Sequence, residues 1–347
     1  MTNRLSKTSV AVWVLGALVA IMVAALVPHI FINPLVTQIG FYALVYAVMA
    51  SAWNILGGYA GYFSLGHAAF FGIGGYSMAI ICQDYNIQGG YAPFFLLPLV
   101  GLIAVAFAIP LGIITLRTRR HVFVILTIAM LFIGQLLAYN LINVTGGSNG
   151  MLLPFAPWPG GSYNLPFYYV ALLILIVTLL VSFWIRVSKF GLGLLAIRDD
   201  EDRAQGLGIN VWLFKLVAFV VPAFFIGMAG AMYFYFQGQI VPQFAFNPLD
   251  DLAMVLMSFT GGLGTVLGPA LGALLIESAQ QYFALQYGAG GYYLIIYGAL
   301  FIVIIMLMPR GILPSGIAAW RRFVTERRTT TTLPVAAPPA EPAVAEK

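Results

Sequence analysis

The densest group of charged side chains in this sequence is four carboxylates followed by a basic residue: Asp199, Asp200, Glu201, Asp202 and Arg203. Carboxylates at the start of a helix are stabilised by the positive end of the helix dipole. Arg203 lies four residues after Asp199, which is the spacing of an ion pair along one helix face. Gly206 and Gly208 then suit the end of such a helix. The run predicts a short charged helix to which a partner protein docks, while a solvated connector would have the same composition.

Two further titratable residues lie within or beside apolar runs. Glu277 lies inside the run 265–285, and a carboxylate at the middle of a membrane costs at least about 2.5–3.5 kcal/mol. Glu277 should therefore face a bundle interior, either as part of a transport pathway or as a structural hydrogen-bonding group. His67 follows Gly66, where it either gates a pathway or makes a local hydrogen bond at a helix start.

Other kinds of chemistry find no support in the sequence. Ser64 near His67 lacks a supporting carboxylate, so no catalytic group is complete. No two of the three histidines have the spacing of metal ligands, and no GxxxxGK[ST] nucleotide motif occurs. The single cysteine, Cys82, excludes a disulfide framework. We therefore expect neither an enzyme nor a metal site, and no cofactor held by this chain.

The elements that position these residues are membrane helices. The chain is 61% hydrophobic and 8% charged, and its mean hydropathy is +0.96. The net charge of +5 does not indicate nucleic acid, because the basic residues lie at the ends of apolar segments. The sequence therefore predicts an all-α polytopic integral membrane protein.

Ten apolar runs can be drawn as transmembrane helices, because a span needs about 20 mainly apolar residues. They are residues 9–31, 35–56, 66–82, 92–116, 122–142, 166–187, 213–236, 249–262, 265–285 and 292–309. The transmembrane domain then covers residues 9–315, between a basic leader at 1–8 and a tail at 316–347. The tail begins with basic residues, which either anchor the topology or bind anionic lipid, and ends in a disordered Thr, Pro and Ala segment.

The positive charges give these spans an orientation. If both termini are cytoplasmic, every Lys and Arg falls on the cytoplasmic side, as the positive-inside rule requires. The inner loops and their borders hold Arg117, Arg119, Arg120, Arg186, Lys189, Arg198, Arg203 and Lys215. The outer loops are neutral or acidic and hold Asp84, Asp250 and Asp251. Glu277 is then the one carboxylate expected deep within a span.

Two glycine-rich segments resemble each other and suggest a degenerate internal repeat. Gly57 and Gly58 are followed by Gly66-His67-Ala68, and Gly261 and Gly262 are followed by Gly268-Pro269-Ala270. Glycine allows a membrane helix to break, and the freed peptide groups must then face protein or water. The paired segments predict broken helices along a translocation pathway, whereas single glycines would serve only close helix packing.

Three motifs carry a resemblance to a known family. They are SLGHAAFFGIGGY at 64–76, AIRDDEDRAQGLGIN at 196–210 and FTGGLGTVLGPALGALL at 259–275, in this order. With them, the chain resembles the LivM-type permeases of branched-chain amino acid ABC transporters over roughly residues 9–315. The resemblance implies a multi-pass subunit of the bacterial inner membrane that forms half of a pore. Its implied partners are a second related permease, two cytoplasmic ATPases that use the ATP, a periplasmic binding protein and membrane lipid.

The resemblance also gives the inner loop at 189–211 a role. This loop is similar to the segment that couples importer permeases to their ATPases, whose pattern is Glu-Ala-Ala, three residues, then Gly. Asp202, Arg203, Ala204 and Gly208 occupy these positions. Ala204 and Gly208 agree with the pattern, Asp202 is a shorter acid, and Arg203 replaces a small residue. Together with Asp199, these residues are the predicted ATPase contacts.

Branched-chain amino acids are the substrates that the resemblance implies. Related systems carry urea, other amino acids or small organic acids, and selectivity can reside in the binding protein. The lack of a nucleotide motif also fits a self-sufficient secondary carrier or channel, which remains the alternative class.

Overall fold

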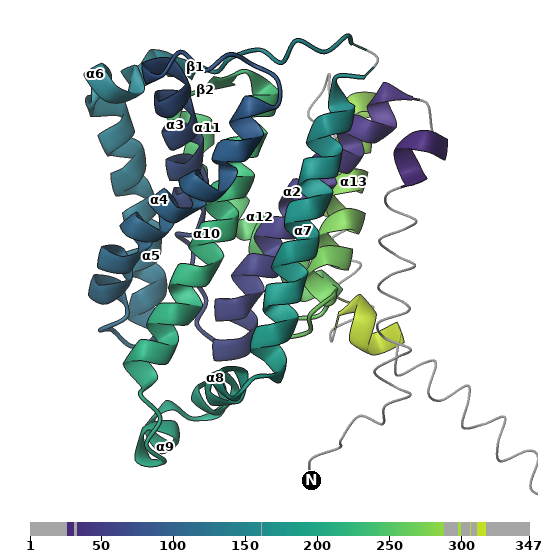
Figure 1. The fold of residues 1–347 in the computed structure, drawn as a ribbon. Coiled ribbons are helices and arrows are strands. Elements are labelled where there is room, and N and C mark those ends of the chain that lie inside the picture. The colour runs from purple at the N-terminus through teal and green to yellow at the C-terminus, as the bar shows by residue number, and fades with distance from the viewer. Residues whose placement is uncertain are drawn as a thin grey trace, which may run out of the picture.

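The computed structural model describes residues 26–30, 33–160, 162–287, 298–299, 306 and 311–316. These residues form a bundle of α-helices with one small ribbon of two strands (Figure 1). The predicted leader, the predicted tail apart from Gly316, and most of the predicted spans 9–31 and 292–309 lie outside the described residues. The number of ten spans therefore stays a prediction.

The described helices follow the predicted spans closely. They are α2 (Pro34–Asn54), α3 (Ala68–Asp84), α4 (Ala92–Thr115), α5 (Arg120–Asn140), α6 (Ile142–Thr145), α7 (Asn164–Val187), α8 (Lys189–Asp199), α9 (Glu201–Gly206), α10 (Val211–Gln237), α11 (Pro242–Ala245), α12 (Pro248–Gly261) and α13 (Gly268–Tyr287). A π-helix, η1 (Ile55–Ala60), continues α2, and η2 (Gly147–Asn149) is a 3-10 turn. Strands β1 (Met151–Leu152) and β2 (Gln239–Ile240) pair antiparallel.

Five of these helices are long and apolar enough to cross a membrane. Within the described residues they are α2 with η1, α4, α5, α7 and α10. This finding supports an all-α membrane protein. Helices α3 and α12 have only 17 and 14 residues. At 1.5 Å per residue they measure about 25 and 21 Å, less than the roughly 30 Å of a hydrocarbon core.

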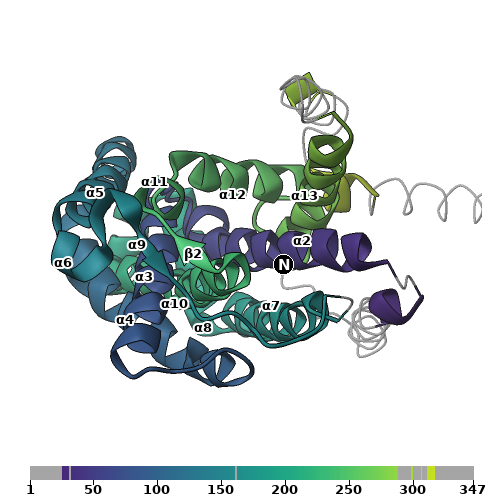
Figure 2. The ribbon, with the colours of Figure 1, turned by 90° about the horizontal axis from the view of Figure 1, so that it is seen from above.

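The helices form two groups, which Figures 1 and 2 show from the side and from above. Helices α3, α4 and α5 lie together with α10, and α13 and α7 lie beside α2, while α2 and α10 also pack on each other. Helices α8 and α9 lie at one end of the bundle, and β1 and β2 lie at the other (Figure 1). We call these the α8–α9 end and the β1–β2 end.

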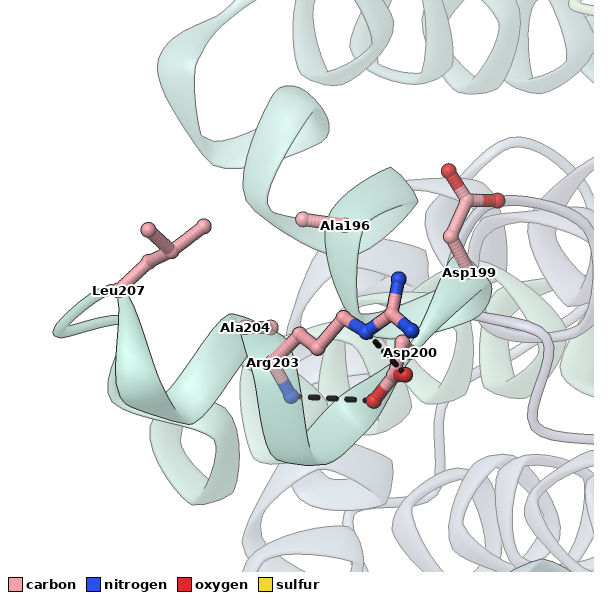
Figure 3. A pocket seen from close by; sticks show the side chains of 6 residues that line it. All are labelled: Ala196, Asp199, Asp200, Arg203, Ala204 and Leu207. Atoms are coloured by element: carbon pink, nitrogen blue, oxygen red, sulfur yellow. Dashed lines mark hydrogen bonds and ion pairs between the residues drawn. The ribbon is translucent and has the colours of Figure 1, made fainter.

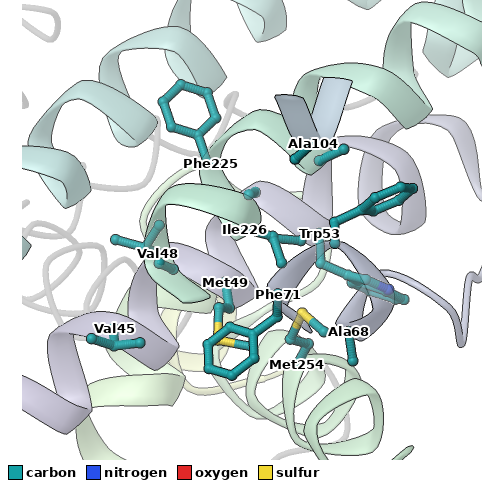
Figure 4. Packing of buried hydrophobic residues seen from close by; sticks show 14 of the residues in the cluster. Val45, Val48, Met49, Trp53, Ala68, Phe71, Ala104, Phe225, Ile226 and Met254 are labelled. Carbon is teal, nitrogen blue, oxygen red and sulfur yellow. The ribbon is translucent and has the colours of Figure 1, made fainter. Parts of the chain in front are cut away.

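The core lies where these helices meet. Figure 4 shows apolar side chains of α2, α3, α4, α10 and α12 packed together, including Met49, Phe71 and Met254. Helices α3 and α10 approach each other at glycines, because a Cβ on Gly74 would overlap the backbone of Gly227. Close packing through glycine therefore explains part of the glycine content of the first motif.

Both glycine-rich segments interrupt helices, as the sequence predicted. After η1, Gly61 takes a left-handed conformation with φ of 70°, and the chain stays non-helical until α3 begins at Ala68. After α12, Gly262 has φ of 127°, and α13 begins at Gly268. We call residues 61–67 the first break and residues 262–267 the second break. Their origin as a repeat stays a prediction.

Candidate functional site

The acidic run lies at the junction of α8 and α9. Asp200 stands between the helices, and its side chain caps α9 by accepting a hydrogen bond from Arg203 N at 3.0 Å. Arg203 Nε also forms an ion pair with Asp200 Oδ2 at 3.0 Å. The predicted pairing of Arg203 with Asp199 is wrong, because Asp199 ends α8 while Asp200 takes the capping position of α9. Asp202 and Gly208 are exposed to solvent.

A pocket of about 450 Å³ opens between α8 and α9. Figure 3 shows the six residues that line it, Ala196, Asp199, Asp200, Arg203, Ala204 and Leu207. Three predicted ATPase contacts therefore lie in one pocket. Ala204 is 1% exposed and packs inside the chain, whereas Leu207 is 81% exposed. The pocket offers a partner one apolar side chain beside charged groups.

Helix α8 is bonded to the end of η1. Arg198 Nη1 donates a hydrogen bond of 2.7 Å to the carbonyl oxygen of Gly58. The neighbouring Gly57 lies against the ring of Trp53, which leaves no room for a Cβ. Two of the predicted gate residues therefore lie beside the predicted coupling loop.

The second break is bonded to one side chain of α2. Asn54 Oδ1 accepts a hydrogen bond from Gly264 N at 2.8 Å, and Asn54 Nδ2 donates to the Thr265 carbonyl at 2.9 Å. The predicted gate residues Gly261 and Gly262 stand directly before this contact, at the end of α12. The structure thus brings the junction of α2 and η1 together with the second break.

Arg120, at the start of α5, holds the carbonyl end of α8. One guanidinium nitrogen, Nη2, donates to the carbonyls of Ile197 and Arg198 at 2.8 and 2.9 Å. The last carbonyls of a helix lack partners within the helix, and a basic side chain satisfies them. The same guanidinium lies 5.7 Å from the centre of the Tyr62 ring in the first break.

Helix α9 is tied to the first break and to α10 by three polar side chains. The Tyr62 hydroxyl donates to Glu201 Oε2, and Lys215 Nζ lies 2.7 Å from Glu201 Oε1. Lys215 also donates to the Tyr62 hydroxyl at 3.2 Å. Burial acts to raise the pKa of Glu201, but the bonds from Lys215 and Tyr62 outweigh it and the pKa is lowered. Glu201 is therefore held as a carboxylate.

The other end of the first break is packed against α5 and α10. Leu65 N donates to Thr127 Oγ1 at 3.1 Å, and a Cβ on Gly66 would overlap the Thr127 carbonyl. His67 is fully buried, with its ring centre 5.0 Å from that of Phe219. The gating role of Gly66 and His67 stays a prediction.

Three carboxylates are buried in the bundle. Asp250 and Asp251 stand in the first turn of α12 and are 8% and 1% exposed, and Glu277 is 1% exposed. Placing both aspartates in an outer loop was therefore wrong, because they belong to a helix and are buried. The cause is that α12 begins inside the bundle rather than at its surface. That Glu277 is the one carboxylate deep within a span stays a prediction. The described residues contain no group of His, Cys, Asp and Glu that could hold a metal ion.

Each buried carboxylate has a hydrogen-bonding partner. Asp250 Oδ1 accepts from the Tyr46 hydroxyl at 2.8 Å, and Asp251 Oδ1 accepts from Ala68 N at 3.1 Å. Glu277 Oε1 accepts from Gln281 Nε2 at 2.8 Å. Asp251 thus caps the start of α3 from another helix.

Sequence reasoning missed several residues of this site as site residues, namely Asn54, Tyr62, Arg120, Arg198, Glu201 and Lys215. A signal existed for Lys215, since a charged residue inside an apolar helix needs a partner. Arg198 lies in the second motif, yet nothing in its spacing indicates a carbonyl partner 140 residues away.

Comparison with known proteins identifies relatives over most of the chain. Residues 35–305 match a family model described as the permease component of the branched-chain amino acid transport system. LivM of Escherichia coli K12, a permease protein of the high-affinity branched-chain amino acid transport system, is 26% identical over 323 residues. That match covers 86% of this chain and 74% of LivM.

A second kind of permease from such systems is also similar. LivH of Salmonella typhimurium is 25% identical over 286 residues, covering 77% of this chain and 91% of LivH. A probable LivH of Methanocaldococcus jannaschii is 26% identical over 207 residues, covering 57% of this chain and 64% of that protein. No solved structure gives a significant match.

Proposed function

Because this chain belongs to the family of branched-chain amino acid transport permease components, we propose that it forms half of the pore of an ABC importer for branched-chain amino acids. The chain is a permease, not an enzyme. Its relatives LivM and LivH are both permease proteins of high-affinity branched-chain amino acid transport systems. This shared role supports the substrate class.

The second half of the pore would be a related permease. The chain is similar to LivM and LivH, two permease proteins of the same kind of transport system. Two related subunits can each contribute short, broken helices to a shared pathway, because irregular backbone at membrane depth must face protein or water. The short helices α3 and α12 and the two breaks are the parts of this chain suited to that position.

ATP hydrolysis would take place in two separate subunits that dock at α8 and α9. The observation that carries this proposal is that the α8–α9 pair has two different sides. One side is exposed and carries Leu207, Asp202 and Arg203, and the other is bonded to the first break and to η1. A pair of short helices held in this way can pass movement of a docked ATPase to the membrane helices as a rigid lever.

The α8–α9 end would face the cytoplasm. Arg117, Arg119 and Lys189 belong to this end, and basic residues favour the cytoplasmic side. A periplasmic binding protein would then deliver substrate at the β1–β2 end. This orientation also gives the soluble ATPases access to α8 and α9.

The test is transport by the assembled complex. The chain is tagged and purified from native membranes in mild detergent, its partners are identified, and the complex is reconstituted in liposomes with its binding protein. We expect ATP-dependent uptake of radiolabelled leucine, isoleucine and valine that dissipation of ion gradients leaves unchanged. Uptake of urea, another amino acid or an organic acid instead would change the substrate class. Gradient-driven uptake by the chain alone would establish a secondary carrier.

A substitution in α9 tests the docking surface. Gly208 has φ of 85° and open space around it, so a Gly208→Trp change adds bulk at the exposed end of α9. We expect this variant to insert normally but to lose ATPase binding and ATP-driven uptake. Normal docking and uptake in correctly inserted Gly208→Trp protein would show that the ATPases bind elsewhere.

A further inference from the structure

We infer that Arg198 is a positioning residue for transport, through which movement of α8 acts on the two breaks at once. This inference rests on the proposed function and deepens it. Arg198 Nη1 lies 2.7 Å from the Gly58 carbonyl at the end of η1. The same nitrogen is 2.9 Å from the place that a Cβ would take on Gly264 in the second break. Arg198 Cγ is also 2.9 Å from the place that a Cβ would take on Gly61, the first residue of the first break. The Arg198 side chain therefore lies against both breaks.

The Gly58 carbonyl depends on an external donor. Gly58 lies in the last turn of η1, where carbonyl groups lack donors from the same helix. A buried carbonyl without a donor costs free energy, and a charged donor gives a stronger hydrogen bond than a neutral one. Within the described part of the chain, Arg198 makes no ion pair, and its guanidinium donates to the Gly58 carbonyl.

The end of η1 and the second break are also locked to each other. A Cβ on Gly58 would lie 2.8 Å from Gly264 N, so their backbones are in close contact. The side chain of Asn54 bonds to both residues 264 and 265 of the second break. A displacement of Gly58 toward Gly264 must therefore displace Gly264 as well and strain its bond to Asn54.

Helix α8 can pass on a movement because both ends of the connection are fixed. The α8 carbonyls of Ile197 and Arg198 are held by Arg120, and the Arg198 side chain continues to Gly58. If a docked ATPase shifts α8, the Gly58 carbonyl either follows Arg198 or loses its donor. Arg198 thus connects the docking helices to the broken helices by one hydrogen bond.

The experiment uses the complete complex in liposomes and measures substrate uptake per ATP hydrolysed. We expect Arg198→Gln to assemble and to hydrolyse ATP, while uptake per ATP falls about tenfold, the effect of losing one hydrogen bond to a charged group. Arg198→Lys should recover part of the uptake, because its ammonium group is also a charged donor. The control is Arg119→Gln, which removes an exposed charge at the same end and should behave as wild type.

A second pair of variants keeps Arg198 and disturbs its surroundings. Residue 264 has a φ of 77°, which is unfavourable for alanine, and the Cβ added by Gly264→Ala presses against the Arg198 guanidinium. Gly90→Ala has an unfavourable φ of 114°, but its Cβ meets only Pro157, at 3.7 Å. We expect uptake per ATP to fall in Gly264→Ala and to stay normal in Gly90→Ala. If Arg198→Gln fails to assemble, the comparison of uptake per ATP between Gly264→Ala and Gly90→Ala tests the inference by itself.

The outcomes separate the inference from the proposed function. If the wild-type complex shows no ATP-dependent uptake, the proposed function fails before any variant is compared. If wild type transports and Arg198→Gln or Gly264→Ala has the same uptake per ATP, Arg198 does not connect α8 to the breaks. A variant can also transport less only because less complex assembles. If its uptake per ATP hydrolysed then equals that of wild type, the inference is overturned as well.

Discussion

The ammonium group of Lys215 lies 2.7 Å from Glu201 Oε1 and joins the start of α10 to α9. The lysine side chain is 6% exposed and the glutamate side chain 31% exposed. A pair of this kind fixes a short surface helix against the bundle, because removing either partner leaves a poorly solvated charge behind.

Lys215→Met should loosen α9. Breaking a fully buried pair costs about 3–5 kcal/mol, and the partial exposure of Glu201 reduces the expected loss to about 1–2 kcal/mol. We expect a lower thermal unfolding temperature in detergent and faster proteolysis at residues 201–208. The matched control is Arg203→Met, which breaks an exposed pair with Asp200 and should cost no more than about 0.5 kcal/mol. Equal losses in both variants would contradict this account.

The contact at Glu201 should also depend on pH. Its pKa in the folded protein is lowered from the ordinary 4.5, since the bonds from Lys215 and Tyr62 outweigh the effect of burial. The carboxylate therefore contributes stability that is present above pH 4.5 and is lost as the pH falls through the lowered folded pKa. A spin label at Gln205 should gain mobility only below pH 4.5. The same label in Glu201→Gln protein should show no such transition, and mobility changing between pH 6 and 8 would argue against this origin.

Gly74→Ala should destabilise the packing of α3 on α10. A Cβ at this position overlaps the Gly227 carbonyl, so the two helices must separate, at a cost of about 1–3 kcal/mol. We expect a lower yield of folded protein and a lower unfolding temperature. Gly160→Ala is the control, because nothing lies within 4 Å of its added Cβ. A Gly74→Ala protein as stable as the control would show that the two helices can separate freely.

Asp251 should be needed as an acceptor rather than as a charge. Its Oδ1 atom caps the start of α3 through Ala68 N at 3.1 Å. Asp251→Asn keeps an oxygen at this place and should fold normally, whereas Asp251→Leu should lose about 0.5–2 kcal/mol, the value of a helix cap. Thermal unfolding of both variants in the same detergent measures the difference. If Asp251→Asn and Asp251→Leu lower the unfolding temperature equally, the negative charge itself is required.

The membrane helices could be predicted because lipid imposes a simple rule on them. Hydropathy located α4, α5, α7 and α10 within a few residues, since long apolar runs have few other stable forms. Glycine clusters located both breaks. The acidic run and the following glycines located α9, because the signals for a helix start and a helix end are local.

The remaining features depend on contacts between distant parts of the chain. Asp250 and Asp251 stand at the very start of the predicted span 249–262 and therefore read as residues of the outer loop before it, but they lie buried in the first turn of α12. The bonds of Arg198 to Gly58 and of Asn54 to Gly264 join positions 140 and 210 residues apart. No local pattern encodes such a partner, so the part of the site that connects α8 to the breaks required the structure.

The bond between Asn54 and Gly264 has a consequence for biosynthesis. Gly264 lies 210 residues after Asn54, so a ribosome that adds about 5–20 residues per second needs about 10–40 s to reach it. During this interval Asn54 has emerged without its partners from the second break. The helix pair α2 and α13 can therefore assemble only late in translation, and a chain truncated before residue 264 should be a substrate for membrane quality control.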